Sequence, residues 1–374
     1  MRFIIIILLT LVLVSCKDGD KGNPNNPKII LLKNENKTIN LSELVSEVNY
    51  ISLETLPESL IGEIIKIKIS DKKIYILNQT GITTSIKVFS YTGDYLGHIG
   101  EIGNGPKEII RPRDFVLNND IIYVWDTKGI HSFSKTGGYL KFMFEAHFVG
   151  RTFFVNNRYF FFLHELNPPG FLTKYDIKGN LKKVFIPIKY SLGAFEQSKI
   201  IELNGSYHIF SPLIDTIYTY SDNNLFQKYL IQCNNAKSLG KLFLENKELN
   251  PYELSKVINK TPSFSITQYI ENQDFLYIIY SIDTKNNTLI INKKTGNYSY
   301  VKHFINDVDG GIYGNSRLIT NENELVIPLN SYDILEHIKN NPNVVAQDSP
   351  LNTISKNLDL TSNPVLMICK LKSE

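Results

Sequence analysis

The sequence contains few of the residues from which catalytic and metal sites are most often built. Three cysteines and seven histidines occur among 374 residues. The histidines never fall at the spacings of a zinc site, and neither a His-Glu-x-x-His nor a Gly-x-Ser-x-Gly motif is present. Cys233 and Cys369 lie in apolar, strand-like runs, so we expect both to be buried free thiols.

An excess of one charge and a long apolar run are also missing. Lys and Arg number 40 against 37 Asp and Glu, a formal net charge of +3. This balance gives no indication of nucleic acid binding. The apolar run from Phe3 to Val14 is too short to span a bilayer, which takes roughly 20 residues. Behind the positive charge of Arg2, it has the length of the apolar part of a secretory signal.

The residues that end this run resemble the bacterial lipobox. Leu13-Val14-Ser15-Cys16 places a small residue directly before a cysteine. The resemblance implies that residues 1–15 are a lipoprotein signal peptide and that the Cys16 thiol is lipidated. An ordinary signal peptide with an incidental cysteine is the alternative. Because no aspartate follows Cys16, we expect an outer-membrane lipoprotein, on the periplasmic side or at the cell surface.

The chain after Cys16 divides into two parts. Residues 17–28 are rich in Gly, Asn, Pro and Lys and show no apolar period. We therefore expect residues 16–38 to form a lipidated, flexible tether. Residues 39–374 are expected to form one folded domain, since all-β domains of this length are common.

Two kinds of turn recur along this domain. Six Asn- or Asp-rich turns each precede an aromatic-rich apolar run, as in Asn118-Asn119-Asp120 before Ile122-Tyr123-Val124-Trp125. A second kind of turn occurs five times, and four of these turns, centred on Gly93, Gly137, Gly179 and Asn223, are 42 to 44 residues apart. Such residues suit tight hairpins. Two hairpins in each 40 to 50 residues predict four-stranded antiparallel blades, and the count predicts a six-bladed β-propeller.

The last unit lacks its second turn because the chain stops after the strand at 364–371. The spare strand Val48–Leu53 precedes the first unit, and we expect it to pair with that final strand and close the ring. Two segments interrupt the repeat, near 234–263 and 331–363. Both are expected to be helical insertions.

Several of these segments resemble one known family. The chain is similar to the six-bladed propeller lipoproteins of gut-dwelling Gram-negative bacteria, which are related in fold to NHL-repeat propellers. The resemblance covers about residues 40–373. At Gly103-Asn104-Gly105-Pro106-Lys107-Glu108, Lys107 stands where the family usually has glycine, and Ile109 where it has an aromatic residue. Roles tied to these two positions do not carry over. The other residues that carry the resemblance are Ile51-Ser52-Leu53-Glu54-Thr55, Leu60-Ile61-Gly62-Glu63-Ile64, Gly100, Asn363-Pro364-Val365-Leu366 and Lys370-Leu371-Lys372.

The candidate binding residues are those expected on the loop-rich face of the propeller. An arginine pair and an aromatic residue beside a rim loop suit a carboxylate, a sugar or a peptide end. For each of them a structural role, in ion pairs or in the core, is the alternative. The candidates are Arg111, Arg113, Asp114, Trp125, Asp126, His164, Glu165 and Tyr332.

The pattern therefore favours a binding module over an enzyme, with membrane attachment through the lipid and no nucleic acid partner. Its ligand, whether a small molecule, a glycan, a peptide or another envelope protein, is left open. The alternative is a calcium-dependent propeller hydrolase or lyase, similar to lactonases, with its site at the central opening. No other cofactor is expected.

Overall fold

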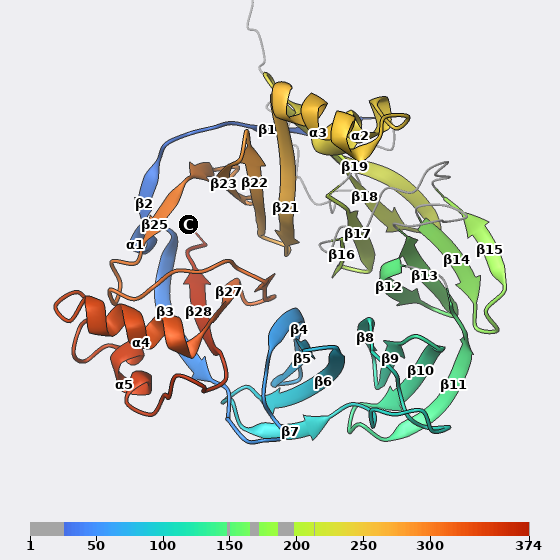
Figure 1. Cartoon of the computed structure of the whole chain (residues 1–374), viewed down its shortest axis with the longest axis horizontal. Coiled ribbons are helices and arrows are strands. Elements are labelled where there is room, and N and C mark those ends of the chain that lie inside the picture. Colours follow the sequence, from blue (N-terminus) through green and yellow to red (C-terminus); the bar gives the residue numbers. More distant parts are fainter. Residues whose placement is uncertain (1–25, 148–149, 165–171, 186–197, 213, 374) are drawn as a thin grey trace, which may run out of the picture.

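The computed structural model describes residues 26–147, 150–164, 172–185, 198–212 and 214–373. Six sheets, each built on four antiparallel strands, stand in a ring around a central opening (Figure 1). Each contributes four strands to its blade, so the predicted six-bladed β-propeller is confirmed. Residues 1–25, with the expected signal peptide and Cys16, lie outside the described residues.

The first three blades follow one another along the chain, each running from the central opening to the rim. Blade 1 contains β4 (Glu63–Ser70), β5 (Lys73–Thr80), β6 (Thr83–Ser90) and β7 (Tyr95–His98). Blade 2 contains β8 (Asp114–Asn118), β9 (Ile121–Trp125), β10 (Gly129–Ser134) and β11 (Tyr139–Glu145). Blade 3 contains β12 (Gly150–Asn156), β13 (Tyr159–His164), β14 (Leu172–Asp176) and β15 (Leu181–Val184).

The other three blades carry additional strands or close the ring. Blade 4 contains β16 (Lys199–Leu203), β17 (Ser206–Phe210), β18 (Thr216–Ser221) and β19 (Asn224–Cys233). Blade 5 contains β21 (Ser263–Glu271), β22 (Phe275–Ile282), β23 (Lys285–Asn292) and β24 (Tyr298–Val301), with the short β20 (Lys237–Ser238) beside β21. Blade 6 contains β26 (Leu318–Ile319), β27 (Glu324–Leu329), β28 (Val365–Leu371) and β3 (Val45–Ser52).

The ring is closed by the pairing of β3 with β28, as the sequence predicts. The two strands run antiparallel, with Ile51 opposite Leu366 and Tyr50 opposite Met367. Side chains alternate along β28, so Leu366 packs toward blade 1 and Met367 toward blade 5. The final strand is thus buried on both faces and hydrogen-bonded on both edges.

Asn363 fastens this seam from the residues just before β28. Its side-chain amide donates to the carbonyl oxygen of Glu54 at 2.7 Å and accepts from the backbone N–H of Ile61 at 2.7 Å. Its own backbone N–H donates to the hydroxyl of Thr55 at 2.9 Å. Because Asn363 is buried, water cannot replace these hydrogen bonds, which connect the segment before β28 to the segment after β3.

The expected tether is shorter than predicted, because part of residues 16–38 is folded. Strand β1 (Lys28–Leu32) pairs in parallel with β19 and adds a fifth strand to blade 4. Its alternate residues Ile30 and Leu32 are buried in the core between blades 4 and 5. The chain then crosses blade 5 through β2 (Thr38–Asn40), which pairs with β25 (His303–Ile305), and enters α1 (Leu41–Leu44) before β3.

The recurring turns adopt the backbone that their residues favour. Asn119, Asn157 and Asn204 have φ angles of 51°, 54° and 50°, and Gly137 has 89°. These left-handed conformations are accessible to Asn and Gly at low cost. The hairpin signals in the sequence therefore mark real hairpins, which is why the blade count could be predicted.

Helices occupy both interruptions of the repeat. Helices α2 (Leu239–Glu245) and α3 (Pro251–Lys260) lie between blades 4 and 5, and α4 (Ser331–Asn340) and α5 (Pro350–Ser355) lie between β27 and β28. The side chain of Asn250 caps α3 by accepting from the N–H of Glu253 at 3.0 Å. No helix in the described part of the chain is long and apolar enough to cross a membrane.

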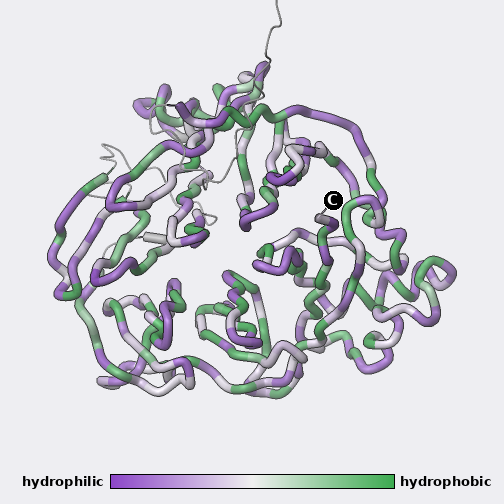
Figure 2. The backbone as a smooth tube through the Cα atoms, turned by 180° about the vertical axis from the view of Figure 1, so that it is seen from behind, coloured by the Kyte–Doolittle hydropathy of each residue, from purple (hydrophilic) through white to green (hydrophobic). Residues whose placement is uncertain are grey.

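The core lies between neighbouring blades. Hydrophobic and hydrophilic residues alternate along many strands, as the colours of the tube in Figure 2 show. One cluster joins Leu77 of blade 1 to Phe115 and Phe133 of blade 2, and another joins Phe161 of blade 3 to Tyr220 of blade 4. Because each blade shares its apolar faces with two neighbours, the inner strands are held in fixed positions around the central opening.

We predict that Asn363→Ala destabilises the fold by about 1–3 kcal/mol, since it leaves buried backbone groups of the seam without partners. Urea unfolding at neutral pH measures the change. Asn286→Ala, at an exposed position of β23, is the matched control and should stay within about 0.5 kcal/mol of the wild type. Equal stability of the two variants would show that the seam does not depend on Asn363.

Candidate functional site at the central opening

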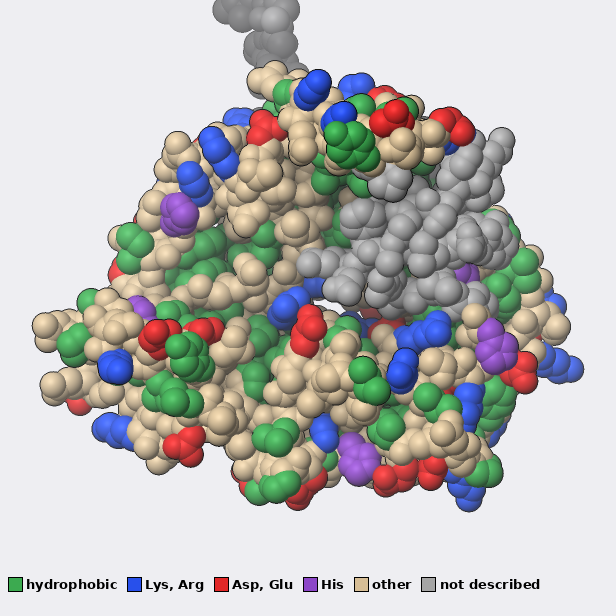
Figure 3. All heavy atoms as spheres, viewed as in Figure 1, with side chains coloured by type: hydrophobic (Ala, Val, Ile, Leu, Met, Phe, Trp, Pro, Cys, Tyr) green, Lys and Arg blue, Asp and Glu red, His purple; other side chains and the backbone are tan. Residues whose placement is uncertain are grey.

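A cavity of about 140 Å³ lies at the centre of the ring, between the innermost strands. The space-filling view in Figure 3 shows basic and acidic side chains close to this central hollow. Among the described residues, five basic and two acidic side chains line the cavity, together with isoleucines from β4 and β16. The charged lining residues are Lys66, Lys68, Arg113, Lys199, Arg317, Asp114 and Glu271.

Asp114 is engaged in a bridge across three blades. Its carboxylate binds the Lys66 ammonium of β4 at 2.5 Å and accepts from the Thr152 hydroxyl of β12 at 2.7 Å. It also accepts from the backbone N–H groups of Phe115 and Phe153. Asp114 is almost fully buried, so this bridge neutralises Lys66 in place and leaves Asp114 little capacity for a further ligand.

Glu271 is the second acidic residue, and it is neutralised in the same way. At the end of β21, it accepts from His208 Nδ1 at 2.5 Å and pairs with the Lys293 ammonium at 2.8 Å and that of Lys228 at 3.4 Å. The Tyr269 and Tyr229 hydroxyls donate to it as well. Burial opposes its ionisation, but His208 and the two lysines outweigh burial and hold the pKa of Glu271 well below its usual range.

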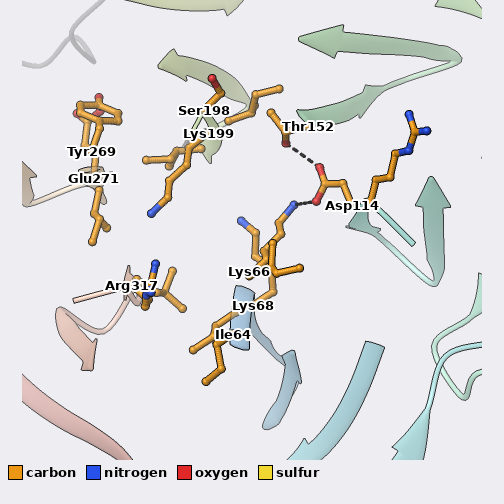
Figure 4. A pocket seen from close by; sticks show the side chains of 17 residues that line it. Ile64, Lys66, Lys68, Asp114, Thr152, Ser198, Lys199, Tyr269, Glu271 and Arg317 are labelled. Carbon is orange, nitrogen blue, oxygen red and sulfur yellow. Dashed lines mark hydrogen bonds and ion pairs between the residues drawn. The ribbon is translucent and has the colours of Figure 1, made fainter. Parts of the chain in front are cut away.

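Three cations of the cavity have no such partner. In the described part of the chain, the side chains of Lys68, Lys199 and Arg317 make no hydrogen bond and no ion pair. They come from blade 1, blade 4 and the residue before β26 in blade 6. In Figure 4 the three side chains extend toward the same central space, while Lys66 turns away to Asp114.

Burial and the repulsion among these cations lower the pKa values of both lysines. Burial is the largest cause that lowers the pKa of Lys199 to about 7, and the charges of Arg317, Lys68 and Lys66 act in the same direction. Burial and then Lys66 lower the pKa of Lys68 to about 8, against a smaller opposing effect of Asp114 and Glu202. Clustered groups with shifted pKa values in a cavity are typical of functional sites.

Of the residues proposed from the sequence, only Arg113 and Asp114 line the cavity. The Arg113 guanidinium lies 5.6 Å from the centre of the Trp125 ring, and its backbone N–H donates to the Trp125 carbonyl. Arg111 is exposed in the loop before β8, with a φ of 49°. The structure thus separates the two arginines that the sequence suggested as a pair.

The other candidates that the structure describes do not line the cavity. Trp125 is fully buried between blades 2 and 3, where it packs on Phe153 and Phe162 and donates to the Ala146 carbonyl. Asp126 is also buried and accepts from three backbone N–H groups of its own and the preceding loop. His164 contacts the Thr173 hydroxyl at 2.5 Å inside blade 3. Tyr332 is half exposed on α4, and Glu165 lies outside the described residues.

Sequence reasoning missed Lys66, Lys68, Lys199 and Arg317. A local signal did exist for two of them: β4 reads Glu-Ile-Ile-Lys-Ile-Lys-Ile-Ser, with lysines inside an apolar first strand of a blade. Lys199 likewise begins the first strand of blade 4. A lysine in the innermost strand of a blade is therefore as good an indication of a site in this fold as a charged loop residue.

A calcium site of the kind found in propeller hydrolases would need several oxygen ligands at the central opening. Within the described residues, no group of three or more His, Cys, Asp or Glu could hold a metal ion. The two carboxylates of the cavity already bind lysines. The lining thus suits an anion rather than a cation.

The fold and the cavity define the protein as a six-bladed propeller with a basic central cavity. Residues 27–370 match a family described as a domain of unknown function (DUF4934), and the chain belongs to this family. No protein with a curated description matches the chain.

Among solved structures, a Bacteroides fragilis protein classed as exported has a TM-score of 0.76 at 15% identity, over 92% of this chain and 100% of that one. AztD from Citrobacter koseri has a TM-score of 0.40 at 9% identity, over 73% and 71% of the two chains. The extracellular domain of a Bacteroides thetaiotaomicron protein classed as a one-component system has 0.41 at 10% identity, over 75% and 32%. The first likeness shows a shared fold, and the other two carry no conclusion.

We predict that Glu271→Gln destabilises the protein by about 3–5 kcal/mol at pH 7, because two lysines lose their buried counter-charge. The lowered pKa of Glu271 means that its ionised form stabilises the fold above the unfolded-state pKa of about 4.3. This stabilisation is lost as the pH falls further, so the difference from wild type should narrow between about pH 5 and pH 3.

Urea unfolding across this pH range tests the prediction. Glu248→Gln removes one carboxylate at a position 87% exposed and should leave both the stability and its pH dependence as in wild type. A deficit of Glu271→Gln that is constant with pH would contradict the ionic role of Glu271.

Proposed function

We propose that the protein is a ligand-binding module of the cell envelope that holds the anionic part of its ligand in the central cavity. The observation that carries this proposal is the cluster of Lys68, Lys199 and Arg317, three cations that face one space without a counter-ion among the described residues. Like charges at such a place oppose folding, and a bound anion removes that cost.

Binding accounts for the cavity better than catalysis does. A lactonase-like hydrolase requires oxygen ligands for calcium, and the carboxylates here are bound to lysines instead. A tightly held calcium at the opening, with a hydrolytic activity that chelation abolishes, would overturn the binding proposal. A structural role in an envelope complex remains compatible with the fold, but it gives the three cations no function.

We predict that a small multivalent anion raises the melting temperature of the wild-type protein. Binding at 100 times Kd stabilises a protein by about 2.7 kcal/mol. Thermal unfolding is measured with sulfate, phosphate, citrate and acetate, each against sodium chloride at equal ionic strength, because general screening affects every charge. The double variant Lys68→Gln/Lys199→Gln should lose the rise.

The control for this experiment is Lys285→Gln, which removes one exposed lysine at the start of β23, a strand that does not line the cavity. It should retain the full response to the anion. The proposal fails if no anion exceeds chloride, or if the double variant responds as strongly as the wild type.

We also propose that the protein is exported and attached to the outer membrane through Cys16. The lipobox-like Leu13-Val14-Ser15-Cys16 and the preceding apolar run support this placement. The Bacteroides fragilis protein of similar fold is classed as exported, which agrees with it. A diacylglycerol on the Cys16 thiol, with two or three acyl chains in total on this residue, would hold the propeller at the membrane through the tether before β1.

We predict that Cys16→Ser abolishes metabolic labelling of the protein by an alkyne-tagged fatty acid and moves the protein from the membrane fraction to the soluble fraction. Cys233→Ser is the matched control, since this thiol lies at the end of β19 within the propeller, and its labelling should be unchanged. Retention of label in Cys16→Ser would disprove the anchor.

A further inference from the structure

We infer that the group held in the central cavity is a tetrahedral oxyanion, a sulfate or phosphate ester that terminates a larger ligand. The inference rests on the proposed function and names the ligand class of the same site. It depends on the directions from which the cations approach, on the charge that they leave uncompensated and on the size of the cavity.

The three cations reach the cavity from three different blades. Lys68 comes from β4, Lys199 from β16 on the opposite side of the ring, and Arg317 from the residue before β26. A carboxylate has two oxygens in one plane, and a single arginine can satisfy both. A sulfate or phosphate ester has three terminal oxygens that point in three directions. Cations on three sides can therefore each contact an oxygen of the ester at once.

The uncompensated charge also favours such a group. Lys66 is neutralised by Asp114, and Glu271 by its own two lysines, so neither acidic residue offsets the other cations. Glu202, on β16, is exposed and only weakly favours the charged form of Lys68. A phosphate ester carries −1.5 to −2 at pH 7, roughly twice the charge of a carboxylate, and thus removes more of the repulsion among the three cations. A sulfate ester carries a single negative charge, as a carboxylate does, so its advantage over a carboxylate rests on its three terminal oxygens alone.

The cavity is large enough for the ester group but not for a whole ligand. Its volume of about 140 Å³ is below the roughly 300–1,000 Å³ of pockets that enclose a drug-sized molecule. Arg317 is exposed, so one side of the cation cluster is open to solvent. The body of the ligand would extend from this open side, which is how a modified sugar at the end of a glycan could present its ester.

Three hexose probes that differ in their anionic group test the inference: glucuronate, glucose 6-sulfate and glucose 6-phosphate. Isothermal titration of the full-length mature protein at constant ionic strength gives the three dissociation constants. We expect both esters to bind at least tenfold more tightly than glucuronate. The order of the two esters then identifies the source as a sulfated or a phosphorylated ligand.

The outcomes separate this inference from the proposed function. If glucuronate binds as tightly as the esters, the cavity is an anion site without preference for a tetrahedral group, and the inference is wrong. If none of the three probes binds and inorganic sulfate and phosphate do not bind either, the proposed function itself fails. Lys199→Gln should weaken ester binding about tenfold or more, and Lys285→Gln should not change it.

The pH dependence of glucose 6-sulfate binding provides an independent check, because the charge of this probe is constant between pH 6 and pH 9. An anion favours the protonated form of Lys199, whose pKa is about 7 and which faces Arg317, Lys68 and Lys66. Affinity should therefore fall as the pH rises through 7, and fall again near 8 as Lys68 loses its proton.

Lys199→Arg supplies the matched variant for this check. It keeps the positive charge but does not titrate in this range, so the fall near pH 7 should disappear while the step near pH 8 remains. A pH profile identical to that of the wild type would place the bound ester away from Lys199 and overturn the inference.

Discussion

The antiparallel pairing of β3 with β28 is the constraint on which the rest of the molecule depends. Each blade buries apolar side chains on both faces, so a blade without two neighbours would expose half of its core. Only a closed ring gives every blade two neighbours. The pairing brings the chain just before blade 1 against its last strand, and Asn363 binds Glu54, Thr55 and Ile61 across the seam. Segments that marked the family in the sequence are thus the segments that close the ring.

Closure also sets the chemistry of the central opening. Six inner strands converge there, so residues that are far apart in the sequence become neighbours through the geometry of the ring alone. Lys66 of blade 1 meets Asp114 of blade 2 and, through it, Thr152 of blade 3. A rigid ring keeps such side chains in place, since moving one strand would disturb the cores on both sides of its blade. The cations of the cavity therefore remain close together despite their repulsion, so the proposed anion site is arranged before any ligand binds.

The sequence predicted the fold because its signals are local. Asn and Gly at the hairpins adopt left-handed angles wherever they stand, and the spacing of the hairpins counts the blades. Strand β1 was not predicted because it pairs in parallel with β19, which is distant in the sequence, and no hairpin turn connects the two strands. The residues of the central cavity could be predicted even less well from the sequence. Lys68, Lys199 and Arg317 belong to three blades, and no spacing in the chain indicates that they meet. Trp125 and Asp126 have the residue types of a binding site, but their side chains face the core and their own loop.

The propeller contains two clusters of charged side chains that differ in how their charges are compensated. At Glu271 the fold surrounds a buried carboxylate with two lysines, a histidine and two tyrosine hydroxyls, so its charge is compensated on every side. In the same cavity, Lys68, Lys199 and Arg317 pair with no carboxylate among the described residues, and burial, followed by the charges of its cationic neighbours, lowers the pKa of Lys199 to about 7. Within the described residues, the fold thus compensates two buried carboxylates fully but leaves three cations of the same cavity without a paired carboxylate. A negative charge from outside the protein would remove their repulsion, and this is the physical basis of the proposed anion site.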